Sequence, residues 1–256
     1  MITDKVFRAG SNYPVNYRFK VSNRDCNHLL IVMSGFNVPD PTIYDFENAL
    51  MHCDSYILWI KDDFRGKPAY YLCNQMSFEI EDNVSDLIKG VISFLKNPNV
   101  SIMGASKGGS MALYYGIKHN ISHIVSVVPQ FNIGSYVANG TYWEHIGQEM
   151  MGEITEDKIK ILNNKIIDMI SNVKNKKINI YLFTSPNDHQ YESEILPNID
   201  VFSQYEKFNL IVSKSEFITQ HSEVASFNIK LLLSLIYQFE HGISPEWGII
   251  NNGGDW

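Results

Sequence analysis

The chain has 256 residues and a formal net charge of −7, and 45% of its residues are hydrophobic. This composition supports one large hydrophobic core and excludes an intrinsically disordered chain. The acidic balance excludes a protein that binds nucleic-acid phosphates or anionic lipid through its overall charge.

No apolar run is long enough to cross a bilayer, and residues 1–14 lack the apolar stretch of a signal peptide. The three cysteines, Cys26, Cys53 and Cys73, show no paired spacing. This pattern favours reduced thiols over disulfides or a metal site. We therefore expect a cytoplasmic protein without a bound metal.

Short apolar runs alternate with longer helical patterns, as in a parallel sheet covered by helices. We predict one or two edge strands in residues 5–21, followed by six buried strands at 28–34, 55–60, 100–104, 123–128, 178–183 and 208–213. Helices are predicted from about residue 41, at 79–96, at 108–119, within 155–175 and at 222–240.

These elements predict a single α/β domain over residues 1–256, with a mostly parallel central sheet and helices on both faces. Residues 131–176 begin with an aromatic-rich stretch of no clear period and are predicted to form a small helical lid. Residues 243–256 are predicted to form an irregular surface tail. In such sheets the reactive groups lie at the carboxyl ends of the strands.

The clearest chemical signal is Gly104-Ala105-Ser106-Lys107-Gly108, which fits the G-x-S-x-G nucleophile elbow. It follows a predicted apolar strand and opens a predicted helix, which is the setting that this turn requires. Small neighbours are needed because the serine backbone is held in a strained conformation. We predict that Ser106 is the nucleophile of an α/β-hydrolase fold; a plain glycine-rich turn is the alternative.

A serine hydroxyl needs a base, and in this fold the acid and the histidine follow the serine in that order. Asp188 comes directly after the next-to-last predicted strand, and His221 ends the loop after the last one. We therefore predict a Ser106, Asp188, His221 triad. His189 is the strongest rival base, but it follows the wrong strand. The alternative acids are Asp200 and Glu192.

Most of the remaining histidines fall at strand starts or helix ends on the opposite side of the sheet, where surface positions are expected. A solvated turn is likewise expected for the run from Asp62 to Gly66. The loop after the first buried strand is a candidate oxyanion hole. There Gly35 would allow the backbone N–H of Phe36 to join that of Lys107 as a donor pair. An ordinary strand-to-helix turn is the alternative.

The run G-A-S-K-G-G resembles the elbow of bacterial capsule polysaccharide O-acetyltransferases of the α/β-hydrolase fold. Related capsule-biosynthesis and accessory-secretion proteins have a comparable elbow. The similarity covers about residues 28–235 and includes residues 63–74, the run around Asp188 and the loop with His221. The run T-S-P-N-D before the acid and the tryptophan-rich tail depart from the family pattern.

The resemblance implies that acetyl-CoA is the acyl donor and a glycan hydroxyl the acceptor, with no cofactor held by the protein. It also implies several residues that shape the substrate pocket, for which structural hydrogen bonding is the alternative role. These residues are Arg65, Tyr70, Tyr71, Asn74 and Gln130. The aromatic residues Tyr136, Tyr142 and Trp143 of the predicted lid are further candidates for contact with a sugar or acyl group, and packing over the helices is their alternative role.

We therefore predict a serine O-acyltransferase that acetylates a bacterial surface or capsular polysaccharide. A carboxylesterase or deacetylase acting on a glycan or small ester would use the same residues, so it remains an alternative. A non-catalytic scaffold in a glycan-assembly or secretion complex is the alternative from another class. The expected partners are a glycan or small ester, without nucleic acid; a homo-oligomer or a capsule-assembly complex stays open.

Overall fold

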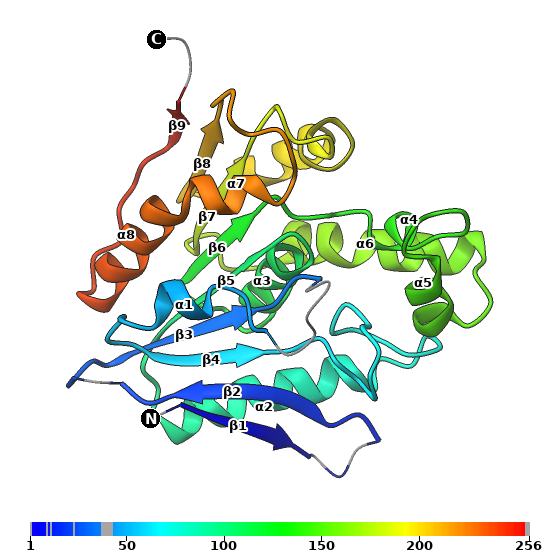
Figure 1. Cartoon of the computed structure of the whole chain (residues 1–256), viewed down its shortest axis with the longest axis horizontal. Helices are drawn as coiled ribbons and strands as arrows, with labels where there is room; N and C mark the ends of the chain where they lie inside the picture. The colour runs from blue at the N-terminus through cyan, green and yellow to red at the C-terminus, as the bar shows by residue number, and fades with distance from the viewer. Residues whose placement is uncertain (1, 9, 11, 23, 37–42, 254–256) are drawn as a thin grey trace.

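The computed structural model describes residues 2–8, 10, 12–22, 24–36 and 43–253. The strands in chain order are β1 (Ile2–Phe7), β2 (Val15–Lys20), β3 (His28–Met33), β4 (Tyr56–Ile60), β5 (Asn99–Ala105), β6 (His123–Val127), β7 (Asn179–Thr184), β8 (Phe208–Ser213) and β9 (Ile249–Asn252). Within the described ranges they form one sheet in the order β1-β2-β4-β3-β5-β6-β7-β8-β9 (Figure 1). β2 is antiparallel to both β1 and β4, and all the other neighbours are parallel.

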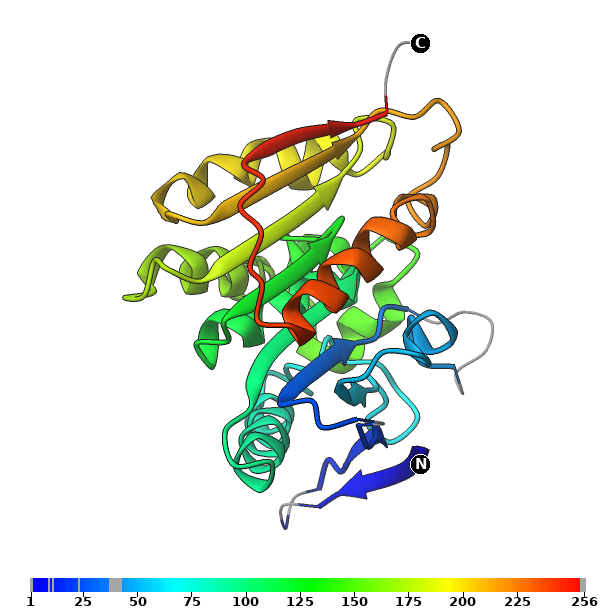
Figure 2. The same ribbon diagram turned by 90° about the vertical axis from the view of Figure 1, so that its left-hand side faces the viewer.

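Helices cover both faces of this sheet. They are α1 (Glu47–Leu50), α2 (Glu79–Phe94), α3 (Lys107–Lys118), α4 (Ile133–Tyr136), α5 (Glu144–Met151), α6 (Glu156–Asn172), the π-helix η1 (Tyr191–Ile195), the 3-10 helix η2 (Leu196–Gln204), α7 (Glu223–Phe227) and α8 (Ile229–Glu240). One buried cluster joins the sheet to α2, α3 and α6, and a second joins its other face to α1, α7 and α8 (Figure 2). None of the described helices has both the length and the apolarity of a membrane span.

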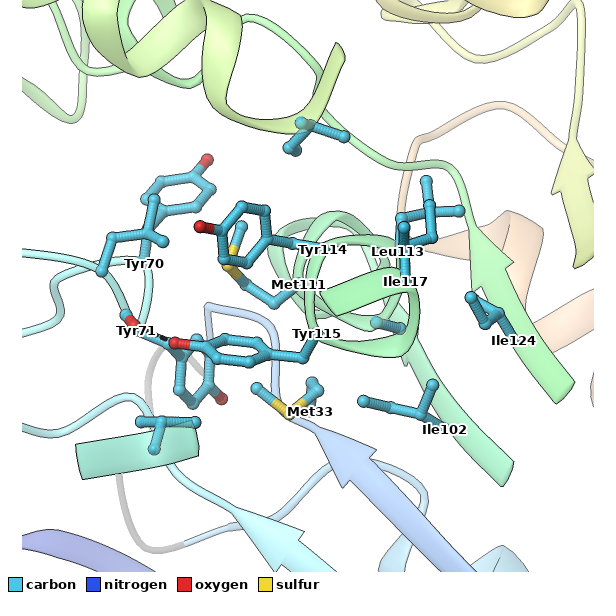
Figure 3. Packing of buried hydrophobic residues seen from close by; sticks show 14 of the residues in the cluster. Met33, Tyr70, Tyr71, Ile102, Met111, Leu113, Tyr114, Tyr115, Ile117 and Ile124 are labelled. Atoms are coloured by element: carbon cyan, nitrogen blue, oxygen red, sulfur yellow. Dashed lines mark hydrogen bonds between the residues drawn. The ribbon is translucent and has the colours of Figure 1, made fainter. Parts of the chain in front are cut away.

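Helix α3 is the most deeply enclosed helix near the carboxyl edge of the sheet, with its residues buried from Lys107 to Ile117. Figure 3 shows Tyr114 and Tyr115 on this helix, with Tyr70 and Tyr71 of the loop between β4 and α2 packed beside it. The Tyr115 hydroxyl donates a hydrogen bond of 2.6 Å to the backbone carbonyl of Tyr71. The later turns of α3 are therefore held against the sheet and this loop.

The six predicted buried strands are confirmed as β3 to β8, and the predicted edge strands as β1 and β2. The helix predicted at 222–240 is divided at Asn228, whose side-chain amide donates to the Ser213 hydroxyl at 2.8 Å. A helix is predicted from about residue 41, a position outside the described residues. Within the described residues, the helix in this region is the single turn α1, which begins at Glu47.

The prediction of an irregular tail is wrong for Ile249–Asn252, which form β9 and extend the sheet in parallel beside β8. The side-chain oxygen of Asn209 accepts the backbone N–H groups of Trp247 at 2.6 Å and Gly248 at 3.1 Å. This contact aligns the chain just before it joins the sheet. Because the strand has only four residues, two isoleucines followed by two asparagines, it shows no alternation in the sequence.

Residues 131–176, predicted as a lid, contain α4, α5 and α6. Helix α6 buries Leu162, Ile166 and Ile170 and packs against α3. This helix is therefore part of the layer that covers the sheet. The aromatic side chains before it lie close to the carboxyl edge, where the candidate site is found.

The expectation of surface positions is wrong for His28 and His123, which are 1% and 8% exposed. The His28 ring lies between the hydroxyls of Ser55 and Ser101, at 2.7 and 2.8 Å. These residues lie at the amino ends of the strands, opposite the candidate site. Burial lowers the pKa of His28 to about 4, and it does the same for His119 and His123.

We predict that the fold loses stability between pH 7 and pH 5. The unfolded chain takes up protons on these histidines below about pH 6.5, whereas the folded chain binds them only near pH 4. The free energy of unfolding therefore falls as the pH is lowered through this window. Urea titrations at several pH values measure the effect, and equal unfolding free energies at pH 7 and pH 5 would contradict it.

Candidate active site

Ser106 lies at the sharp turn between β5 and α3, at the carboxyl edge of the sheet. Its backbone has φ 55° and ψ −126°, a conformation that L-residues rarely adopt. A Cβ atom at Gly108 would overlap the backbone carbonyl of Met33, and one at Gly104 would overlap the backbone of Gly108. The glycines of the motif are thus required by the close packing of α3 on β3, as the sequence predicts.

Asp188 follows β7 and His221 lies in the loop between β8 and α7, so the two come together at the same edge. His221 Nδ1 lies 2.8 Å from Asp188 Oδ2, and the other carboxylate oxygen accepts the backbone N–H of Gln190 at 3.0 Å. Burial alone would raise the pKa of Asp188, but the hydrogen bond and charge of His221 lower it below its usual value. Asp188 is therefore held as a carboxylate, which fixes the orientation of the imidazole.

The rival base His189 lies 3.6 Å from Asp188, but its side chain is 72% exposed, against 15% for His221. The imidazole of His189 is thus turned mainly towards solvent. The structure therefore brings the predicted acid and the predicted base together and leaves the rival outside.

A carboxamide lies between the serine and the histidine. Gln130 Nε2 is 2.7 Å from Ser106 Oγ and 3.5 Å from His221 Nε2. Among the described residues, no direct hydrogen bond joins Ser106 to His221. Gln130 is fully buried and follows β6, the strand next to β5. The three predicted triad residues are thus linked through a fourth side chain.

Ser106 and His221 both line a cavity of about 930 Å³. Phe36, Tyr136 and Trp143 form an aromatic part of its wall. The rings of Phe36 and Trp143 are stacked with centroids 4.3 Å apart and planes 13° apart. This volume and lining fit a substrate with an apolar or sugar-like face.

Lys107, which follows the serine, directs its side chain inward to a buried ion pair. Its Nζ lies 2.6 Å from Asp62 Oδ2 and 4.4 Å from the centroid of the Phe36 ring. Asp62 also accepts the backbone N–H groups of Ala69, Tyr70 and Tyr71, each at 3.0 Å. Burial lowers the pKa of Lys107, and the Asp62 carboxylate partly opposes this. The expectation that Asp62 belongs to a solvated turn is therefore wrong.

The ion pair joins the start of α3 to the loop after β4, and the same ammonium lies over the ring of Phe36 in the other predicted oxyanion loop. The Lys107 N–H belongs to the first turn of α3, where backbone donors have no partner within the helix. In the other loop, the Gly35 N–H is already bonded to Asp45 Oδ2 at 2.7 Å. This contact holds Phe36 beside the start of α3, and the oxyanion role of the two N–H groups stays a prediction.

The other predicted pocket residues take different positions. Trp143 lines the cavity, whereas Tyr70 and Tyr71 are fully buried behind it. Arg65 is exposed and donates to the backbone carbonyl of Asn12 at 2.9 Å, and Asn74 accepts from the Tyr13 hydroxyl at 3.1 Å. Neither Arg65 nor Asn74 is among the residues that line the cavity.

Sequence reasoning missed Gln190 and Glu194, which anchor the Gln130 loop. Gln190 Oε1 accepts from Gln130 Nε2 at 2.9 Å. Glu194, on η1, accepts the backbone N–H groups of Phe131 at 2.7 Å and Asn132 at 2.9 Å. No motif marks these residues, and the only signal was that they closely follow Asp188. In the described ranges, no group of three or more histidine, cysteine or acidic residues is arranged to hold a metal.

No protein-family model matches the chain, and no curated protein matches it in sequence. Several solved structures match in fold. The capsule O-acetyltransferase of Neisseria meningitidis serogroup A is 19% identical with a TM-score of 0.70, over 88% of this chain and 94% of that chain. A mutant of it has been solved in complex with CoA.

A structure of the Glycosylation Associate Protein (Gap123) complex from Streptococcus agalactiae is 18% identical with a TM-score of 0.70, over 93% of this chain and 47% of that chain. FphF, a fluorophosphonate-binding serine hydrolase of Staphylococcus aureus, is 10% identical with a TM-score of 0.65, over 92% of this chain and 98% of that chain. These likenesses confirm the predicted α/β-hydrolase fold.

We predict that Gly108→Ala destabilises the fold by about 1–3 kcal/mol or more, because the added methyl group forces α3 away from the Met33 carbonyl. Gly90→Ala is the matched control, since nothing lies within 4 Å of a Cβ at that helix position. The control should stabilise the protein by about 0.5–1 kcal/mol. Urea unfolding of both variants measures the difference, and similar effects would contradict the packing argument.

We further predict that Lys107→Met destabilises the fold by about 3–5 kcal/mol, because it leaves the Asp62 carboxylate buried without its cation. Asp62→Asn should partly relieve this loss when the two changes are combined. A double-mutant cycle of unfolding free energies measures the coupling. Strictly additive losses would show that the ion pair contributes no coupling.

Proposed function

We propose that this chain is a serine-dependent acyltransferase that works through an acyl-enzyme, with acetyl-CoA as donor and a hydroxyl of a bacterial surface or capsular polysaccharide as acceptor. The observation that carries the proposal is the meeting of an elbow serine with a histidine held by a buried carboxylate. Ser106 and His221 line the same cavity, and Asp188 lies behind His221. The likeness to a capsule O-acetyltransferase supports this choice of acyl group and acceptor.

In the proposed first step, His221 Nε2 removes the Ser106 hydroxyl proton as Oγ attacks the thioester carbonyl carbon. The C–S bond then breaks, and the leaving sulfur takes the proton from His221. Asp188 holds the ring with Nδ1 protonated, so that Nε2 is free to act as the base. The negative charge that forms on the carbonyl oxygen would be stabilised by backbone N–H groups.

The N–H groups proposed for this role are those of Phe36 and Lys107. Loss of one oxyanion donor typically costs about 3 kcal/mol of transition-state stabilisation. The hydrogen bond from Gly35 to Asp45 and the ion pair from Lys107 to Asp62 keep both loops in place without substrate. Such preorganisation is what makes these donors effective, because they need no rearrangement during the reaction.

In the second step, an acceptor hydroxyl loses its proton to His221 and attacks the acyl carbon, and the proton passes back to Ser106 as its ester bond breaks. The stacked rings of Phe36 and Trp143 supply an aromatic surface for a sugar ring beside Ser106.

The charges around the cavity bear on the acyl donor. The residues that line it include Asp45 and Glu47 but no lysine or arginine among those described. A second cavity of about 390 Å³ shares Phe36 and Trp143 with the first, and its charged lining residues are Lys61, Lys67, Lys107, Asp62 and Asp63. We therefore propose that the phosphates of acetyl-CoA bind on that side, where positive charge is available.

A carboxylesterase or deacetylase is the second candidate. A neutral ester fits the main cavity, whose lining residues carry no positive side chain in the described part, and the fold is shared with the serine hydrolase FphF. The likeness to a protein of the Gap123 complex supports a search for protein partners with either activity.

We predict that the protein exposed to p-nitrophenyl acetate or acetyl-CoA gains the mass of one acetyl group, and that Ser106→Ala does not. The serine is the only group proposed to form the ester, so its removal should abolish labelling while the fold is kept. Ser203→Ala is the matched control, because that hydroxyl is exposed and bonded to its own helix at 2.7 Å. Intact-mass spectrometry measures the adduct, and labelling of Ser106→Ala would end the serine mechanism.

A further inference from the structure

The loop that carries Gln130 is fixed at this residue and at the two residues that follow it. Its backbone N–H donates to the Ser110 hydroxyl at 2.8 Å, and its carbonyl accepts from the same hydroxyl at 2.7 Å. The next two backbone N–H groups donate to the buried Glu194 carboxylate. Gln130 is therefore held at a defined place beside the nucleophile.

The side-chain amide of Gln130 lies between three polar side chains. Its Nε2 lies 2.7 Å from Ser106 Oγ, 2.9 Å from Gln190 Oε1 and 3.5 Å from His221 Nε2. Its Oε1 is buried and has no hydrogen-bond donor among the described residues. Such an unsatisfied carbonyl costs about 1–3 kcal/mol, so packing alone does not explain an amide at this position.

The three groups around Gln130 Nε2 would suit a water molecule equally well. A buried water needs two to four polar partners and space for one probe sphere. A water at this point would contact both His221 Nε2 and Ser106 Oγ. The structure therefore places the Gln130 amide where the base would otherwise hold a water next to the acylated serine.

We propose that Gln130 excludes from this point the water that would hydrolyse the acyl-enzyme, and so preserves the acyl group for an acceptor arriving through the cavity. This inference rests on the proposed acyl-enzyme function and goes beyond it by naming the residue that favours transfer over hydrolysis. The Gln130 amide does not compete for the serine proton, because its Nε2 donates a hydrogen bond to Ser106 Oγ.

The competing reaction has a simple course. A water proton passes to His221 Nε2 as the water oxygen bonds to the acyl carbon. The bond between that carbon and Ser106 Oγ then breaks, and the same proton moves from His221 to Oγ. The products are a free carboxylic acid and the unmodified serine. This sequence needs a water within reach of His221 Nε2, and Gln130 Nε2 fills the buried point between that nitrogen and Ser106 Oγ, whereas an acceptor hydroxyl reaches His221 from the cavity that both residues line.

Gln130→Ala and Gln130→Met separate exclusion of water from the loss of a hydrogen bond. Alanine opens a space surrounded by Ser106, Gln190 and His221, whereas methionine fills a volume similar to that of glutamine with apolar atoms. Both variants should acylate more slowly than the wild type. The acetyl-enzyme is formed with p-nitrophenyl acetate in buffer without an acceptor, and its decay is followed by intact mass.

We expect the acetyl-enzyme of Gln130→Ala to decay at least about tenfold faster than that of Gln130→Met, since a water held at the base gains general-base catalysis. If the alanine variant does not fold, Gln130→Asn, which withdraws the amide by one methylene, must show the faster decay. If the acetyl-enzyme of Gln130→Ala, or of Gln130→Asn in its place, has the same lifetime as that of Gln130→Met, the proposal is overturned. A wild-type protein that forms no acetyl-enzyme would refute the proposed function itself, and this inference with it.

Discussion

The approach of helix α3 to strand β3 is the constraint on which the site depends. Gly104 and Gly108 lie so close to each other and to the Met33 carbonyl that no side chain fits at either position. This approach sets the sharp turn between them and holds Ser106 at φ 55°. A larger residue would move the start of α3, and with it the serine hydroxyl and the Lys107 N–H. The position of the nucleophile is therefore a consequence of backbone packing.

Buried and half-buried carboxylates then assemble the rest of the site by binding backbone N–H groups of its loops. Asp62 accepts three such donors, Glu194 accepts two and Asp45 accepts that of Gly35. Asp188 does the same for the segment that carries it, while it orients His221. Ionised acceptors form stronger hydrogen bonds than neutral ones, particularly away from water. Loops without regular structure are thereby held as firmly as helices and strands.

The sequence predicted the features that follow from topology. The apolar strands, the elbow, and the acid and histidine after the last two central strands all have positions that the order of the chain determines. It did not predict the ion pair of Asp62 with Lys107 or the hydrogen bond of Gln130 to Ser106, because these contacts depend on how the loops pack against each other. Strand β9 was missed for a related reason: a four-residue segment without alternation becomes a strand because it pairs with the edge of β8.

The carboxyl edge of the sheet also concentrates features that are unfavourable for stability. Ser106 has positive φ, and so does Val128, a β-branched residue at the end of the neighbouring strand, with φ 41°. Gln130, two residues further on, has a buried carbonyl without a donor in the described chain. Strain and unsatisfied groups of this kind persist only where the surrounding structure enforces them, and they cluster at functional sites. The strained ends of β5 and β6 thus lie side by side, and the hydrogen bond from Gln130 Nε2 to Ser106 Oγ joins them.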